Sequence, residues 1–254
     1  MQVHVALTPA EFSEAPLAGR TAFAIDVLRA TSAAVAACEA GCRRLVPVVD
    51  AVAAEAFAAG DGIDTVRAGE RGGEPLAGFD LGNSPAEFTP ARVGRRTVVL
   101  TTTNGTAAML AASRAARAGL AALTNVTAAA RWAIEEGWDV SILCAGDSGA
   151  LSLEDVVCAG MLVSRLTGPA TRLSGGAETA AAVGRHYGTR LTQLAEDSPW
   201  ARRLLRLGRA ADVAACLRAD VSDVVPVFAD GAFVPRRIPS TGALTAADRP
   251  GGGA

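Results

Sequence analysis

Four polar segments of this 254-residue chain directly follow short apolar runs, and ligands of α/β proteins bind beyond the carboxyl ends of strands. The first segment is DVLRATS at 26–32, in which Asp26 ends the run TAFAI. A carboxylate at a strand end is a common Mg²⁺ ligand because hard cations prefer oxygen, and Arg29 could bind an anion through two parallel N–H donors. In an alternative interpretation Asp26 caps a turn and pairs with Arg29. In either case Thr31 or Ser32 could N-cap the next helix.

The second segment is AGERGG at 68–73, which continues into GFDLGNSPAEF at 78–88. The glycines allow the backbone to approach a ligand closely, and Glu70 beside Arg71 offers an acid and an anion clamp. Gly-rich charged turns are also common on protein surfaces. Farther along, Asp80 is another loop carboxylate, and Asn83 or Ser84 could cap a short helix that begins at the next proline.

The third segment is TTTNGT at 101–106, where an apolar run leads into hydroxyls, an amide and a glycine. Thr102, Thr103, Asn104 and Gly105 would then form the N-terminus of a helix, whose free N–H groups suit a phosphate or carboxylate. The segment is not a Walker loop, because Gly-Lys-Ser/Thr is absent. A plain cap needs one threonine, so the additional hydroxyls favour a ligand site.

The fourth segment is CAGDSG at 144–149, again after an apolar run. A nucleophilic cysteine needs an electropositive neighbourhood. The phosphatase pattern of Cys, five residues and then Arg is missing, because the sixth position after Cys144 is Ala150. We therefore expect Cys144 to pack in the core or to line the site. The string SLED that follows at 152–155 is typical of a helix start.

Histidine is scarce, which limits the chemistry that the chain can perform. Only His4 and His186 are present, and neither lies in a motif-like loop. A His-dependent triad or a two-His metal site is therefore not expected. Carboxylates and hydroxyls must carry the chemistry, which favours oxygen-ligated Mg²⁺ over zinc.

The elements that position these segments alternate between short β-branched runs and Ala-rich helical stretches. This pattern predicts an α/β fold, a three-layer αβα arrangement with a mixed, largely parallel sheet. We expect one domain over residues 1–238 and a flexible tail over residues 239–254. The expected strands are 3–7, 21–25, 44–49, 64–68, 97–100, 119–123, 139–143, 224–228 and 232–235. The expected helices are 32–40, 51–58, 106–118, 128–136, 154–165, 176–187, 199–206 and 210–219.

Composition excludes several classes of partner and location. Half of the chain is apolar but only 4% is aromatic, so small aliphatic side chains must fill the core. The net charge is −2 and all 24 basic residues are arginine, which gives no basic footprint for nucleic acid or membrane. The five cysteines are too few for a disulfide scaffold. Neither a signal peptide nor a spanning segment is apparent, so a cytoplasmic location is expected.

Taken together, the segments resemble the 2-phosphosulfolactate phosphatase family. The matching strings are TAFAIDVLRAT at 21–31, AGERGG, GFDLGNSPAEF, LTTTNGT at 100–106, CAG at 144–146, SLEDVVCAG at 152–160 and DVSDVVPV at 220–227. They occur in order and cover nearly the whole chain.

The resemblance implies a Mg²⁺-dependent hydrolase that converts 2-phospho-3-sulfolactate to 3-sulfolactate and phosphate, a step of coenzyme M biosynthesis. It is also compatible with a homodimer. The three anions of such a substrate need cationic partners, and Arg29, Arg71 and Mg²⁺ are the candidates. We expect Asp26, Glu70 and Arg29 to be catalytic. The expected Mg²⁺ ligands are Asp26, Glu70 and Asp80. The expected substrate-binding residues are Arg71, Asn83, Ser84, Thr102, Thr103, Asn104, Gly105 and Cys144.

Two departures from the family pattern keep alternatives open. Ala107 and Ala150 stand where the family often has basic or aromatic residues. The alternatives are a phosphatase for a different small phosphorylated acid and a non-catalytic homologue that binds anions.

Overall fold

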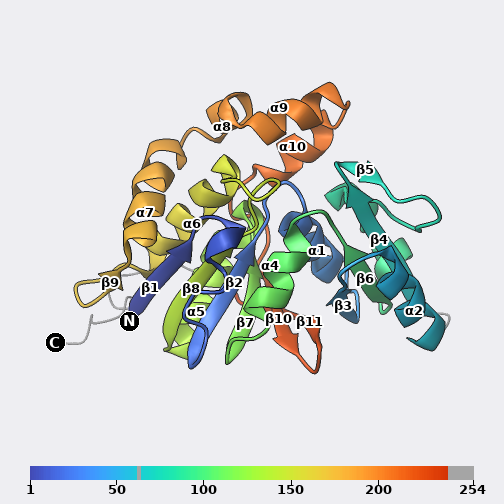
Figure 1. The fold of residues 1–254 in the computed structure, drawn as a ribbon, viewed down its shortest axis with the longest axis horizontal. Helices are drawn as coiled ribbons and strands as arrows, with labels where there is room; N and C mark the ends of the chain where they lie inside the picture. Colours follow the sequence, from blue (N-terminus) through green and yellow to red (C-terminus); the bar gives the residue numbers. More distant parts are fainter. Residues whose placement is uncertain (62–63, 240–254) are drawn as a thin grey trace.

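The computed structural model describes residues 1–61 and 64–239 (Figure 1). The strands are β1 (Gln2–Ala6), β2 (Arg20–Ile25), β3 (Arg44–Pro47), β4 (Thr65–Arg71), β5 (Glu74–Pro75), β6 (Thr97–Thr101), β7 (Arg117–Ala121), β8 (Asp139–Cys144), β9 (Arg172–Leu173), β10 (Val224–Ala229) and β11 (Ala232–Arg237). The helices are α1 (Ala30–Glu39), α2 (Ala51–Asp61), α3 (Pro90–Val93), α4 (Gly105–Ala112), α5 (Val126–Glu136), α6 (Leu153–Leu166), α7 (Gly175–Tyr187), α8 (Leu191–Asp197), α9 (Pro199–Arg206) and α10 (Ala210–Cys216). Short 3₁₀ turns are η1 (Pro9–Glu11), η2 (Pro85–Glu87) and η3 (Leu123–Asn125).

The strands form one mixed sheet in the order β5-β4-β6-β3-β11-β10-β7-β2-β8-β1-β9. β4, β6 and β3 are parallel to one another, and so are β7, β2, β8, β1 and β9. The antiparallel hairpin of β10 and β11 lies between these two parallel blocks, with Val227 opposite Gly119 and Phe233 opposite Leu45. The largely parallel α/β sheet expected from the sequence is therefore confirmed.

The hairpin reverses the nominal direction of one block relative to the other. Adjacent strands twist by about 20 to 25°, so the five steps from β6 to β2 accumulate a rotation of about 100° or more. The blocks therefore cross rather than oppose each other, and their carboxyl ends can meet. The residue that follows β2, Asp26, indeed lies against Gly105, which begins the helix after β6.

Small aliphatic side chains fill both faces of the sheet, as the composition predicts. On β2, Phe23 and Ile25 pack in a cluster with α5, α6 and α7, whereas Ala22 and Ala24 pack in a second cluster with α1 and α4. The sheet is thus covered by helices on both sides. This arrangement explains why its strands are apolar runs without alternation.

Local sequence determines where several helices begin and end. Ser152 N-caps α6 by accepting a hydrogen bond from the N–H of Asp155 at 3.4 Å, as the string SLED predicts. Ser198 caps α9 and is followed by a proline at the first helical position. α5 ends at Gly137, whose φ of 72° is left-handed.

Other sequence-based elements differ from the structure. The helix expected over 106–118 ends at Ala112, because the chain must turn to enter β7 at Arg117. Thr31 and Ser32 do not cap α1; their hydroxyls donate to the carbonyls of Asp26 and Val27 instead. The strands β5 and β9 and the helices α3 and α8 were not predicted. Of the expected tail, residues 240–254 lie outside the described residues.

The helices α8, α9 and α10 run along one edge of the molecule, above the carboxyl ends of the central strands (Figure 1). None of the helices in residues 1–61 and 64–239 combines the length and apolar character that a bilayer crossing requires.

Candidate active site

Asp26 lies at the centre of the polar loops, at the carboxyl end of β2. Its Oδ1 accepts a hydrogen bond from the N–H of Ala30 at 3.1 Å, and its backbone N–H donates to the Thr31 hydroxyl at 3.0 Å. Its Oδ2 faces the first residue of α4, because a Cβ on Gly105 would lie 2.5 Å from that oxygen. A glycine is therefore required at position 105, and the N-terminus of α4 approaches the carboxylate closely.

The surroundings of Asp26 raise the pKa of its carboxyl group. Burial raises the pKa of Asp26 to about 7, and the negative charges of Glu70 and Glu154 act in the same direction. The Ala30 hydrogen bond and the charge of Arg29 act against this rise. Carboxylates whose pKa is raised in this way are common at functional sites.

Glu70 joins the hairpin of β4 and β5 to the loop that follows β6. Its Oε1 accepts from the N–H of Thr103 at 2.7 Å, and its Oε2 accepts from the N–H of Gly73 at 2.6 Å. The Thr103 hydroxyl in turn accepts from the N–H of Gly72 at 3.1 Å. Two of the predicted segments are thus in direct contact.

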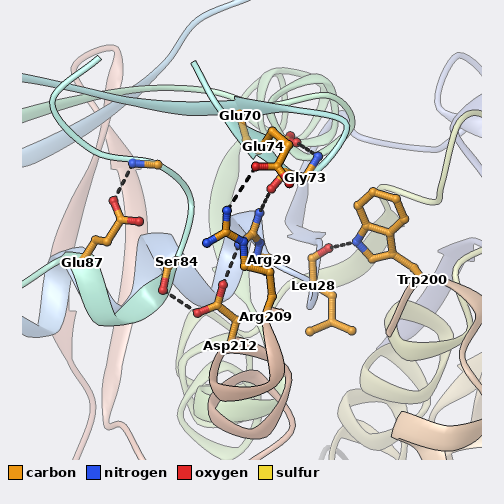
Figure 2. A network of polar contacts seen from close by, with 11 residues as sticks. Leu28, Arg29, Glu70, Gly73, Glu74, Ser84, Glu87, Trp200, Arg209 and Asp212 are labelled. Carbon is orange, nitrogen blue, oxygen red and sulfur yellow. Dashed lines mark hydrogen bonds and ion pairs between the residues drawn. The ribbon is translucent and has the colours of Figure 1, made fainter. Parts of the chain in front are cut away.

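Arg29 is buried and paired, but not with Asp26. Its Nη1 donates to Oδ2 of Asp212 at 2.6 Å, and its Nη2 donates to the carbonyl of Gly73 at 2.7 Å (Figure 2). The other oxygen of Asp212 accepts from the hydroxyl of Ser84. Arg29 therefore links α10, the hairpin of β4 and β5, and the loop that contains Ser84.

The threonine loop, residues 101–106, is held by hydrogen bonds between its own residues. The Thr102 hydroxyl accepts from the N–H of Thr106 at 3.1 Å, so Thr102 satisfies a free donor of the first turn of α4. Thr103 is exposed, in contrast to its buried neighbour Thr102. The amide oxygen of Asn104 accepts from the N–H of Ser148 at 3.3 Å, which brings the third and fourth segments together.

Two further acids lie below these loops at the start of α6. Asp155 accepts from the N–H of Val27 at 2.8 Å and from the N–H of Gly146 at 3.1 Å, which joins the loops that follow β2 and β8. Glu154 accepts from the hydroxyl of Ser198 at 2.7 Å. Burial raises the pKa of both carboxyls, and the charge of Asp26 raises that of Asp155 further.

Four predicted site residues lie elsewhere or play another part. Asp80 is half-exposed and its carboxylate accepts from the N–H of Arg67 at 2.8 Å and pairs with that guanidinium. Arg71 donates to the hydroxyl of Thr101 at 2.9 Å and is exposed. Cys144 is fully buried in the core, and burial raises the pKa of its thiol, so it packs rather than reacts. Asn83 is buried, and its amide oxygen has no hydrogen-bond partner among the described residues.

The sequence of this chain is similar to that of one family of known proteins. The sequence profile of the family described as 2-phosphosulpholactate phosphatase matches residues 6–231. The chain belongs to this family. A protein of Symbiobacterium thermophilum named "Probable 2-phosphosulfolactate phosphatase" is 38% identical over 235 residues, which is 91% of this chain and 98% of that protein. Proteins with the same printed name from Thermosynechococcus vestitus and Gloeobacter violaceus are 36% and 38% identical, covering 81% and 89% of this chain and 87% and 94% of their own lengths.

The acidic side chains of the site are the candidate ligands for a divalent metal ion. Among residues 1–61 and 64–239, no three or more His, Cys, Asp or Glu side chains are arranged to hold an ion. The expected ligand set of Asp26, Glu70 and Asp80 is therefore not assembled. Asp26 and Glu70 are close enough for their charges to interact, and Mg²⁺ often takes only one or two carboxylates with water and phosphate oxygens. Asp26 and Glu70 are therefore the two candidate carboxylates for such an ion.

Asp212 was not predicted from the sequence as a residue of this site. Asp155 was interpreted only as part of a helix start. Both lie in the first turn of a helix, where an acidic side chain is ordinarily explained by the helix dipole. For Asp155 the adjacency to a motif-like loop was a usable signal. For Asp212 no local signal exists, because its partner Arg29 is far away in the chain.

Proposed function

We propose that this chain is a Mg²⁺-dependent phosphatase that hydrolyses 2-phospho-3-sulfolactate to 3-sulfolactate and phosphate. Family membership supports the reaction class. The observation that carries the proposal is the position of Asp26, a buried carboxylate with a raised pKa at the end of a central strand. It faces the N-terminus of α4 and lies near the buried cation Arg29.

Asp26 and Glu70 are the residues that would hold the metal. When bound there, Mg²⁺ supplies positive charge that offsets the charge on the phosphoryl oxygens and lowers the pKa of bound water. Asp80 takes no part in this proposal because it is paired with Arg67.

The chain's own groups bind and orient the phosphate. Arg29 uses one N–H on Asp212 and one on Gly73, and in this proposal the remaining donors of its five bind phosphate oxygens. The N-terminus of α4 and the exposed residue Thr103 add further polar groups for this anion. In the overall reaction, water forms the new P–O bond, and the ester oxygen leaves with a proton as the hydroxyl of 3-sulfolactate.

α9 covers this region and limits its exposure to water. The indole N–H of Trp200 donates to the carbonyl of Leu28 at 2.7 Å, directly beside Arg29 (Figure 2). Arg29 is consequently buried, and its charge acts more strongly than it would in water.

The test is phosphate release from 2-phospho-3-sulfolactate in the presence of Mg²⁺. Asp26→Asn should lower kcat by at least about 100-fold, since even the partners of metal ligands cost 10- to 100-fold when removed. The matched control is Asp80→Asn, which removes a carboxylate from the same group of loops and should stay near wild type. An Asp26→Asn variant as active as that control would remove Asp26 from the mechanism. A wild-type protein that releases no phosphate would refute the proposed function.

A phosphatase for a different small phosphorylated acid is the second candidate. Ala107 and Ala150 are both exposed beside the loops of the site, so the chain lacks positive charge that family members often have there. A panel of small phosphorylated acids, ranked by kcat/KM, would distinguish the two substrates. Tight binding without phosphate release from any of them would instead favour a non-catalytic homologue.

A further inference from the structure

Arg209, which directly precedes α10, has an unfilled hydrogen-bonding edge. Its Nη2 donates to Oε2 of Glu74 at 3.2 Å, and the two side chains are 33% and 56% exposed. Its Nε is buried and has no partner among the described residues. Nε and Nη2 form the side-on edge of a guanidinium, which binds two oxygens of one anion. Nη2 is therefore bound to an exposed carboxylate, whereas Nε has no hydrogen-bond partner among the described residues.

This edge lies next to the proposed phosphate site. Arg29 donates to the carbonyl of Gly73, and Arg209 donates to the side chain of the next residue, Glu74. Figure 2 draws both arginines with their partners on the hairpin of β4 and β5. Arg29 is paired with the buried Asp212, whereas Arg209 is paired, among residues 1–61 and 64–239, with the exposed Glu74.

The two arginines continue a line from the interior to the surface. Asp26 and Arg29 are buried, and Arg209 is partly exposed, while Arg29 and Arg209 contact consecutive residues of the hairpin of β4 and β5. A substrate whose phosphate lies at Asp26 and Arg29 would extend its non-reacting end toward Arg209. That end of 2-phospho-3-sulfolactate is a sulfonate, a tetrahedral anion that suits side-on guanidinium binding.

We propose that Arg209 binds the sulfonate of the substrate and thereby determines specificity, an inference that rests on the proposed function. The sulfonate first displaces Glu74 from Nη2 and, once Glu74 has moved, also accepts from the buried Nε. This displacement costs little because the Glu74–Arg209 pair is exposed. The α9–α10 connection thus supplies a positive charge to a site in which Ala107 and Ala150 supply none.

The experiment compares two substrates that differ only at this end. 2-Phospholactate has the phosphate and carboxylate of 2-phospho-3-sulfolactate but a methyl group in place of the sulfonate-bearing carbon. Arg209→Gln should raise KM for the sulfonated substrate by about 10-fold or more, the loss expected for a charged hydrogen bond, with kcat little changed. KM for 2-phospholactate should stay within about 2-fold of wild type.

Three further variants separate this role from a structural one. Arg209→Lys retains the charge and should recover part of the affinity for the sulfonated substrate. Glu74→Gln removes the competing carboxylate and should lower KM for that substrate alone. Arg206→Gln, an exposed arginine at the end of α9, is the matched control and should match wild type on both substrates.

Two outcomes overturn the proposal. If Arg209→Gln raises KM equally for both substrates, Arg209 binds a group that they share, and if it changes neither, Arg209 does not bind substrate. Failure of the proposed function appears separately, as no turnover of the sulfonated substrate by wild type. In that case, calorimetric binding of 3-sulfolactate and lactate to wild type and Arg209→Gln tests Arg209 alone. Equal affinities in the two proteins would refute its role.

Discussion

Asp212→Asn should destabilise the protein strongly, because it leaves Arg29 as a buried cation without a counter-ion. The Arg29 and Asp212 side chains are 4% and 7% exposed, and their charged atoms lie 2.6 Å apart. Removing one partner of such a buried pair costs about 3–5 kcal/mol. Asparagine preserves the shape and can still accept from Ser84, so the loss reports the charge. At about 2–4 °C per kcal/mol for a chain of this size, Tm should fall by about 6–20 °C.

The matched control is Asp223→Asn. Asp223 also pairs with an arginine, Arg237, but the two side chains are 31% and 61% exposed. Exposed pairs contribute about 1 kcal/mol or less. Urea denaturation followed by circular dichroism would measure both variants under identical conditions. If Asp212→Asn lost no more free energy of unfolding than Asp223→Asn, the argument from burial would be wrong.

A double variant distinguishes the lost charge from lost packing. Replacing a buried ion pair by apolar side chains of similar volume is often neutral or stabilising. Arg29→Met combined with Asp212→Leu should therefore recover most of the stability that Asp212→Asn loses. The double variant should remain inactive, because Arg29 is proposed to contact the phosphate.

Two other predictions concern the surroundings of Asp26. Gly105→Ala should lower the free energy of unfolding by about 1–3 kcal/mol and reduce activity, because its Cβ would clash with Asp26 and with α1. The control is Gly175→Ala, at the first position of α7 with open space around it, which should have little effect. Urea denaturation measures both variants. The second prediction concerns the dependence of stability on pH. Because the pKa of Asp26 rises to about 7 on folding, the folded state binds the proton of this carboxyl more tightly than the unfolded state. The free energy of unfolding in EDTA should therefore fall as pH increases from about 4 to about 7. Asp26→Asn should reduce this slope in pH-dependent denaturation, while Glu154 and Asp155, also raised, retain part of it. An unchanged slope would show that Asp26 is not held as described.

The fold was predictable where burial alone dictates the residue type. Runs such as Phe23–Ile25 and Ile142–Cys144 are apolar because helices cover both faces, and this pattern survives in the sequence. The end of α4 was not predictable, because residues 113–116 have no Gly or Pro and only the position of β7 forces a turn there. β5 and β9 are two residues each, too short for any period to appear.

The site was predictable as a set of loops but not as a set of contacts. Asp26 and Asn104 follow strands whose carboxyl ends meet, and Glu70 lies at the carboxyl end of β4, so their convergence follows from the rule for α/β sheets. The direction of a loop side chain is decided by its neighbours, and Asp80 turns to Arg67 for that reason. The partner of Arg29 comes from α10, and no sequence spacing indicates it.

The position of the β10–β11 hairpin has a consequence for biosynthesis. Asp26 belongs to one parallel block and Glu70 to the other, and the only strands that join the blocks are the last two of the described chain. The ribosome must therefore release nearly the whole polypeptide before the sheet can close. Until then, the edges of β3 and β7 are unpaired and open to aggregation. Catalytic competence should thus appear late and all at once, and a nascent chain that stalls before β10 should depend on chaperones while lacking any partial activity.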